Sequence, residues 1–220
     1  YNKFFFNLTF TTLFDSLAIM KTKVIIATVI LAISGCASAP PKNVTNSCSI
    51  FNEKSSWYKA TKNVREKYGT PIHVQLAIMR QESSFKQDAK PGRDFLMWVI
   101  PWGRKSSAYG YAQVLDGTWD WYREETGNRG ADRDNFEDAA DFIGWYTNIS
   151  QRTLGISKWD AYNQYLAYHE GHGGYKRKTF LKKKWLMEVA NKVDGYSQNY
   201  ARQLQSCEDE LGGGFWLWPF

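Results

Sequence analysis

The stretch that decides the fold covers residues 70–84 and reads TPIHVQLAIMRQESS. Thr70 followed by Pro71 is typical of a helix start, because a threonine side chain can cap free N–H groups and proline fits the first helical position. Apolar side chains then recur on one helical face at Ile72, Leu76 and Met79. The stretch therefore predicts a helix from Pro71 to about Ser84.

Helical periodicity continues on both sides of this stretch. A preceding helix is expected from Ser55 to Gly69, with four side chains on its apolar face: Trp57, Ala60, Val64 and Tyr68. Later helices are expected over four segments: 136–153, 157–171, 177–193 and 196–207. Asn135 or Asp138 can cap the first of them. Because no alternation of period two is sustained, the sequence predicts an all-α domain over residues 55–211.

Residues 91–105 break this helical pattern. Six consecutive large apolar residues, 95–100, lie there between glycines and prolines. Such a run fits a short strand, a hairpin or a loop packed over a cleft. We therefore expect an irregular or β-like insertion in the helical domain.

The N-terminal region has the pattern of a secretory signal at residues 20–35. A basic stretch precedes a ten-residue apolar run, 24–33, and small residues follow. The run is shorter than the roughly 20 apolar residues that a membrane span needs. Residues 1–19 precede Met20 and read as upstream translation. A buried hydrophobic helix is the alternative interpretation of the apolar run.

The end of this signal, Ile33-Ser34-Gly35-Cys36, resembles a bacterial lipobox. The resemblance implies cleavage before Cys36 and lipidation of its thiol, with an ordinary signal peptide as the alternative. A lipidated Cys36 makes a membrane the anchoring partner and the periplasm the compartment, and Ala37 favours the outer membrane. Residues 36–54 read as a flexible tether, and the tail at 212–220 has no assigned role.

The charge balance is mildly basic. Three of the 28 basic and one of the 22 acidic residues precede Cys36, which leaves 25 minus 21, or +4. Lys182-Lys183-Lys184 is a basic run, which fits a solvated helix face but also an anionic wall polymer or acidic lipid heads. No basic stripe recurs, so we expect no nucleic acid partner, and we expect a monomer.

Two cysteines remain if Cys36 carries lipid. Cys48 lies near the start of the exported chain and Cys207 near its end. Export exposes both to oxidising conditions, so a Cys48–Cys207 disulfide is the simplest assignment. Two unrelated thiols are the alternative.

Glu82 has the setting of a catalytic acid. Cleavage of a glycosidic bond requires a carboxyl group that is still protonated near neutral pH, and an apolar environment provides this by raising the pKa. On a helix, Ile78 and Met79 lie one turn before Glu82. Periodicity alone, however, also fits a surface glutamate at a helix end.

Three short motifs strengthen the catalytic interpretation. They are Glu82-Ser83-Ser84-Phe85, Gly110-Tyr111-Ala112-Gln113 and Ala167-Tyr168-His169-Glu170-Gly171. In this order they resemble the Glu-Ser, Gly-x-x-Gln and Ala-Tyr-Asn-Ala-Gly motifs of the soluble lytic transglycosylase family, which is goose-type lysozyme-like. The resemblance covers about Trp57 to Tyr175. It implies a lysozyme-like fold and peptidoglycan glycan strands as the substrate.

The resemblance also implies roles for individual residues. Glu82 would be the single general acid and then base, and Tyr168 would approach it and help set its protonation. The other expected substrate-binding residues of the motifs are Ser83, Gly110, Tyr111 and Gln113. Ser83 would orient the carboxyl or the substrate, Gly110 would let the backbone pass close to a sugar, and Gln113 would hydrogen-bond to it.

Two departures from the family pattern concern histidine and spacing. His169 stands where the family has Asn, and with His172 it forms a His-x-x-His pair without a nearby Cys or a third His. We therefore expect no metal and no other cofactor. The segment between Glu82 and Gly110 is about ten residues longer than the family pattern, because of the insertion.

The tryptophans divide into two groups. Aromatic faces can stack on sugars or pack in a core. Trp98 and Trp102 lie in the insertion and are candidate sugar contacts. Trp145 and Trp185 lie on helix stripes and are expected in the core.

Three functions fit these observations. The implied transglycosylase reaction forms 1,6-anhydroMurNAc ends at the MurNAc-β-1,4-GlcNAc bond and needs only Glu82. A muramidase with the same fold would hydrolyse the bond and need a second carboxylate, for which Asp88, Asp94 and Asp116 are available. A non-catalytic peptidoglycan-binding lipoprotein would not need a carboxyl among apolar neighbours.

Overall fold

The computed structural model describes residues 38–96, 100–104 and 106–212. The predicted signal, Cys36, Trp98 and the tail from residue 213 lie outside the described residues. Residues 38–212 belong to one compact unit. Among the described residues, no helix is both long enough and apolar enough to span a membrane.

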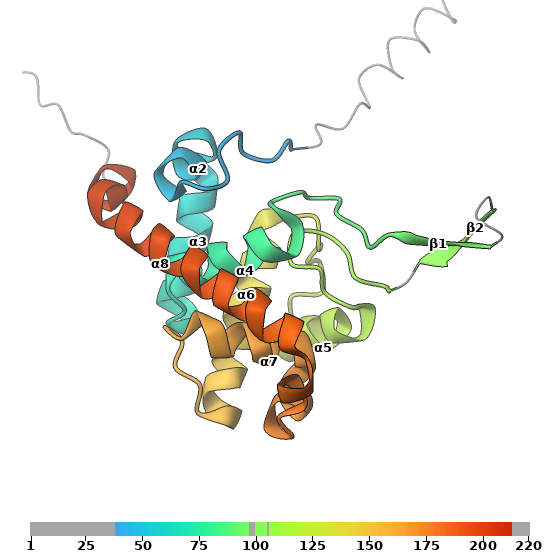
Figure 1. Cartoon of the computed structure of the whole chain (residues 1–220). Helices are drawn as coiled ribbons and strands as arrows, with labels where there is room; N and C mark the ends of the chain where they lie inside the picture. Colours follow the sequence, from blue (N-terminus) through green and yellow to red (C-terminus); the bar gives the residue numbers. More distant parts are fainter. Residues whose placement is uncertain (1–37, 97–99, 105, 213–220) are drawn as a thin grey trace, which may run out of the picture. The chain divides into compact units, whose positions relative to one another are not determined.

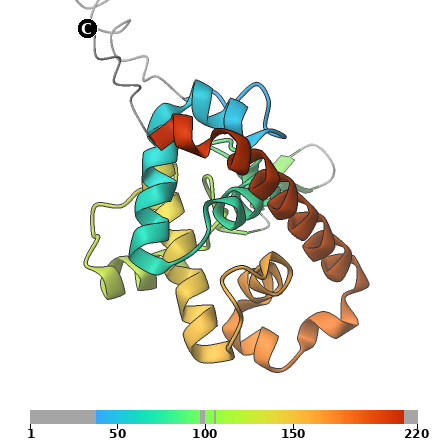
Figure 2. The same cartoon turned by 90° about the vertical axis from the view of Figure 1, so that its left-hand side faces the viewer.

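Helix α4 (Ile72–Ser83) is the central element of this unit. Its side chains are buried around most of its circumference, and Val74, Leu76, Ala77, Ile78 and Met79 have no exposed area. A helix that is buried around most of its circumference must be enclosed by other elements. Figure 2 shows α4 surrounded by the helices α3 (Ser55–Tyr68), α6 (Phe136–Leu154), α7 (Ala161–Lys176) and α8 (Lys184–Gly212). The predicted all-α class is confirmed.

The helix starts and ends follow local sequence signals. Helix α3 ends at Gly69 in a left-handed conformation, as predicted. The side chain of Asn135 accepts hydrogen bonds from the N–H groups of Glu137 and Asp138 and so caps α6. Pro71, rather than Thr70, is the N-cap of α4. The Thr70 hydroxyl instead lies 2.7 Å from that of Thr147 and joins α4 to α6.

The predicted tether is wrong over its second half. Residues 47–53 form the helix α2 (Ser47–Glu53), and Ile50 and Phe51 are completely buried. Asn46 caps α2. A disulfide joins Cys48 of α2 to Cys207 of α8, as the cysteine positions suggest, with the sulfur atoms 2.05 Å apart. The folded domain therefore begins before residue 55.

Two corrections concern helices. The predicted segments 177–193 and 196–207 are not separate helices, because α8 runs through Gly195 and keeps one buried face on both sides of it: Leu186, Ala190, Val193, Ser197, Tyr200 and Leu204. Residues 179–182 form a short 3-10 helix, η1 (Thr179–Lys182). Helix α5 (Asp116–Thr126) was not predicted, because only Trp119 and Tyr122 of its side chains are buried.

The predicted insertion forms a hairpin. Strands β1 (Arg93–Leu96) and β2 (Ile100–Arg104) are antiparallel, and Leu96 pairs with Ile100. In Figure 1 the hairpin extends away from the helices. The β-like interpretation of the insertion is therefore correct for the strand residues that the structure describes, 93–96 and 100–104.

Candidate active site

A cavity of about 430 Å³ lies where α4 ends against α6, α7 and the segment between the hairpin and α5. Glu82, Gln113 and Tyr168, which three separate motifs supply, all line it. Other lining residues include Ser106, Phe142, Tyr146, His169, Glu170 and Gly171. The fold thus brings one polar residue from each of the three motifs into the same cavity.

Glu82 is positioned by the last turn of α4. Ile78 and Met79, one turn earlier, are completely buried, as expected. Burial of the carboxyl raises the pKa of Glu82 to about 7, although a hydrogen bond with Tyr165 favours the charged form and lowers it. The carboxyl end of a helix dipole also disfavours a negative charge. Glu82 can therefore exchange a proton near neutral pH.

The chain turns sharply directly after this carboxyl. Ser84 and Phe85 have φ values of 51° and 61°, in the left-handed region that most residues avoid. Phe85 is completely buried and its ring lies 5.9 Å from that of Trp57. This anchoring offsets the cost of two strained residues, of order 1–3 kcal/mol each. Core packing therefore fixes where α4 ends and where Glu82 lies.

Gln113 presents one free side of its amide to the cavity. Its Nε2 donates to the carbonyl of Ala89 at 2.8 Å and to that of Gly110 at 2.9 Å. These two bonds use both N–H groups, so Oε1 is the atom left to accept from a ligand hydroxyl. In the predicted contact with a sugar, Gln113 would therefore act as a hydrogen-bond acceptor.

Gly110 allows a close approach between two backbone segments, and not the predicted approach of a sugar. Its φ is +77°, and a Cβ atom there would lie 2.0 Å from the carbonyl oxygen of Arg133. The residue is buried and does not line the cavity of Glu82. Gly110 therefore lets the backbone pass Arg133, and so sets the position of Gln113, instead of admitting a sugar.

Two tyrosines of α7 lie close to Glu82. The hydroxyl of Tyr168 donates to the carbonyl of Ala112 at 2.7 Å. The hydrogen-bond partner of Glu82 is instead Tyr165, and burial together with the charge of Glu82 raises the pKa of both phenols. Tyr165 was not predicted, although it lies three residues before Tyr168 on the same helical face.

The chain of α7 is bent at the cavity. Gly171 has φ 72° and ψ 157°, a conformation that essentially only glycine adopts. It interrupts the helix directly after Tyr168, His169 and Glu170, so all three can border the cavity with Gly171 itself. The final glycine of the third motif is therefore required by the backbone.

Two predicted substrate contacts are not in the cavity. Ser83 is buried, and its hydroxyl donates to the carbonyl of Met79 at 3.2 Å. Tyr111 has 1% of its surface exposed and packs edge-on against Trp57 and Phe136. Both residues support the site from the core, and the geometry does not favour a contact with substrate.

The two histidines of the His-x-x-His pair lie in separate environments. His172 lies 3.0 Å from the Ser150 hydroxyl and stacks on Tyr146. His169 lies beside Glu170 and Trp185. Within the described residues, no group of three or more His, Cys, Asp or Glu side chains could hold a metal ion.

Glu170 is a second cavity carboxylate that sequence reasoning missed. Its side chain is only 3% exposed and bonds with Lys183 at 2.6 Å. Thr179 and His169 also contact it. Burial alone would raise the pKa of Glu170, but these partners outweigh burial and lower it. Glu170 therefore remains charged and fully engaged at neutral pH.

The tryptophan predictions have mixed outcomes. Trp145 is 7% exposed and belongs to the core, as predicted. Trp185 is 52% exposed, so its assignment to the core is wrong. Trp102 lies on β2, but its side chain, like the whole of Trp98, is outside the described part of the chain. Their predicted contact with sugars stays a prediction.

The comparison with known families agrees with this site. The chain matches the transglycosylase SLT domain family over residues 24–207. The chain therefore belongs to the transglycosylase SLT domain family, whose members act on peptidoglycan. No curated protein shows a significant match to it.

The position of Gly110 generates a first prediction. Gly110→Ala should lower the free energy of unfolding by about 3 kcal/mol or more, because the new methyl group meets the backbone of Arg133. Gly127→Ala is the matched control: φ there is +70°, but nothing lies within 4 Å, so about 1 kcal/mol is expected. Urea denaturation measures both, and equal losses would contradict the close approach.

Burial of Glu82 generates a second prediction. Its pKa is raised from 4.5 to about 7 in the folded state, so the carboxyl is neutral in both states at low pH, and the folded state must bury a charge above pH 7. Glu82→Gln should therefore be more stable than the wild type at pH 8.5, by about 3 kcal/mol. The difference should shrink as pH falls from 7 to 4.

The control for this measurement is Glu188→Gln, at an exposed position on α8. Replacement of this exposed side chain should change the free energy of unfolding at pH 8.5 by no more than about 0.5 kcal/mol. If Glu82→Gln gave no stabilisation at pH 8.5, the carboxyl would not be held in a setting that disfavours its charge.

Proposed function

We propose that this protein is a lytic transglycosylase that cleaves the MurNAc-β-1,4-GlcNAc bond of peptidoglycan, with Glu82 as its single acid and base. The observation that carries the proposal is a carboxyl group with a pKa of about 7 in a cavity bordered by all three family motifs. A pKa near the working pH suits a group that must first donate and then accept a proton.

The proposed reaction has two proton transfers. Protonated Glu82 donates its proton to the bridging oxygen as the bond from that oxygen to C1 of MurNAc breaks. The resulting carboxylate then takes the proton of the C6 hydroxyl as O6 bonds to C1. The sugar ends as 1,6-anhydroMurNAc, and Glu82 returns to its protonated form. Tyr165, as the hydrogen-bond partner of Glu82, supports the intermediate charged state.

Hydrolysis would require a second carboxylate to activate water on the opposite face of the sugar. Asp88 and Asp116 are exposed and do not line the cavity of Glu82, and Asp116 pairs with Arg133 at 2.8 Å. The side chain of Asp94 lies outside the described residues. Glu170 does line the cavity, but Lys183, Thr179 and His169 occupy its oxygen atoms. These positions favour attack by the C6 hydroxyl.

A non-catalytic binding protein is disfavoured by the same carboxyl. A buried acid with a raised pKa lowers stability as pH rises from about 4.5 to about 7, whereas a glutamine at position 82 would keep the shape without this cost. A module that only binds glycan gains nothing from the acid.

The proposed catalysis is tested by Glu82→Gln, which keeps the shape of the side chain but has no proton to donate. Turnover of purified peptidoglycan should fall by about 10³-fold or more. The wild type should lose activity as pH rises through about 7, because the acid must be protonated. Mass spectrometry of the released fragments should find anhydro ends.

Two results would contradict this proposal. Wild-type turnover by Glu82→Gln would exclude Glu82 as the acid, with Glu188→Gln as the control that should remain fully active. Products with mainly reducing ends would show attack by water and would make Glu170→Gln the next variant to assay.

We also propose that Cys36 is lipidated and that Ala37 permits transfer to the outer membrane, which places the domain in the periplasm. Cys36→Ala should leave the protein in the soluble periplasmic fraction, whereas Ser38→Ala, beyond the proposed cleavage site, should fractionate with the membrane. Membrane association of Cys36→Ala would exclude the lipid anchor.

A further inference from the structure

The segment from Gly171 to Met187 carries the entire net charge of the chain. It contains six basic residues and no acidic one: Lys176, Arg177, Lys178, Lys182, Lys183 and Lys184. The chain has 28 basic and 22 acidic residues, so the 22 basic and 22 acidic residues outside this segment balance. Such concentration on one short segment differs from the mixed charges of the remaining surface.

These six residues, here called the basic corner, lie where α7 ends and α8 begins, on both sides of η1. Five of them are exposed, and Lys183 is half-buried. Among the ion pairs of the described residues, only Lys183 of the six has an acidic partner, Glu170. The corner therefore offers a cluster of charges to an anionic ligand.

The basic corner and its neighbours contact residues that line the cavity. Glu170 lines the cavity and bonds with both Lys183 and Thr179. Trp185, which follows the corner directly, is 52% exposed and lies edge-on to His169, with ring centres 5.2 Å apart. His169 also lines the cavity. A ligand that extends out of the cavity past His169 would thus meet Trp185 and the basic corner.

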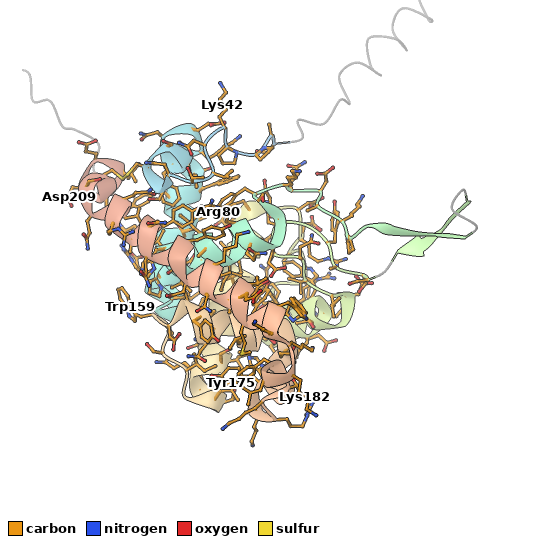
Figure 3. All side chains as sticks on the ribbon, viewed as in Figure 1. Lys42, Arg80, Trp159, Tyr175, Lys182 and Asp209 are labelled. Atoms are coloured by element: carbon orange, nitrogen blue, oxygen red, sulfur yellow. A yellow bond between two sulfur atoms is a disulfide. The ribbon has the colours of Figure 1, made fainter. Side chains whose placement is uncertain are left out.

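The corner faces away from the start of the folded domain. In Figure 3, Lys42 lies at the upper end of the molecule and Lys182 at the lower end. The basic corner therefore lies at the opposite end of the folded domain from Lys42.

We propose that the basic corner binds the free carboxylates of the stem peptides of a peptidoglycan strand whose sugars occupy the cavity. This inference rests on the proposed function and specifies its substrate as peptide-bearing strands. Stem peptides branch from the glycan and carry carboxylates, so they supply negative charge beside the sugars. The exposed indole of Trp185 can pack against the same branch.

The test measures binding with Glu82→Gln as the background, so that turnover does not consume the ligand. Soluble peptide-bearing strands are compared with the same strands after carbodiimide coupling has converted their carboxylates to methylamides. Titration calorimetry should find weaker binding of the neutralised strands. The corner variant adds Lys176→Gln, Lys182→Gln and Lys184→Gln, and its affinity for native strands should fall by about three- to thirtyfold, from the usual strength of exposed ion pairs.

The matched control adds Lys42→Gln, Lys59→Gln and Lys86→Gln, three exposed positions outside both the corner and the cavity. It removes the same total charge and should retain the affinity of the background protein. Added salt should weaken binding of native strands by the background and control proteins, and much less by the corner variant.

Three outcomes would overturn the inference. One is equal binding of native and neutralised strands, and another is an equal loss in the corner and control variants. The third is unchanged strand binding by the corner variant together with lost binding to vesicles containing anionic phospholipid, which would assign the corner to a membrane. Wild-type protein that binds native strands through the corner but releases no anhydro products would contradict the proposed function alone.

Discussion

The carboxyl of Glu82 must be shielded from water and yet remain accessible to a ligand. Helix α4 meets the first requirement because the helices α3, α6, α7 and α8 enclose it, and Ile78 and Met79 beside the carboxyl have no exposed area. The end of α4 meets the second, because the left-handed residues Ser84 and Phe85 stop the helix where the cavity opens. Much of the remaining structure serves to hold this one group in place.

The protonation of Glu82 depends on opposing effects. Burial favours the neutral acid, and so does the carboxyl end of the α4 dipole. Tyr165 favours the carboxylate through its hydrogen bond. Glu170, in contrast, is buried but bonded to Lys183, and its pKa is lowered. The cavity therefore contains two carboxyl groups with different roles. Glu82 can exchange a proton, whereas Glu170 holds the cavity wall in place.

The sequence predicts elements best where an apolar stripe and a cap agree. This applies to α3 with Gly69, to α4 after Pro71 and to α6 with its Asn135 cap. Prediction fails where tertiary contacts decide. Helix α5 buries only Trp119 and Tyr122, and α2 is stabilised by burial of Ile50 and Phe51 and by a disulfide to a distant helix.

The same distinction applies to the site. Motif positions indicated Glu82, Gln113 and Tyr168, all of which line the cavity. The sequence could not indicate that Gly110 faces the backbone of Arg133, or that Tyr111 packs on Trp57, because both contacts join segments that only the fold brings together. Nor could it indicate Glu170, whose partners Thr179 and Lys183 follow the bend at Gly171.

Helix α8 connects the start of the folded domain with the basic corner. Its Cys207 is bonded to Cys48, near the start of the folded domain, and its first residue, Lys184, belongs to the basic corner. At 1.5 Å per residue, these two positions are about 35 Å apart along the helix. Figure 1 shows α8 crossing the helical body from one end to the other. The disulfide therefore ties α2, near the start of the folded domain, to the helix whose first residue belongs to the basic corner.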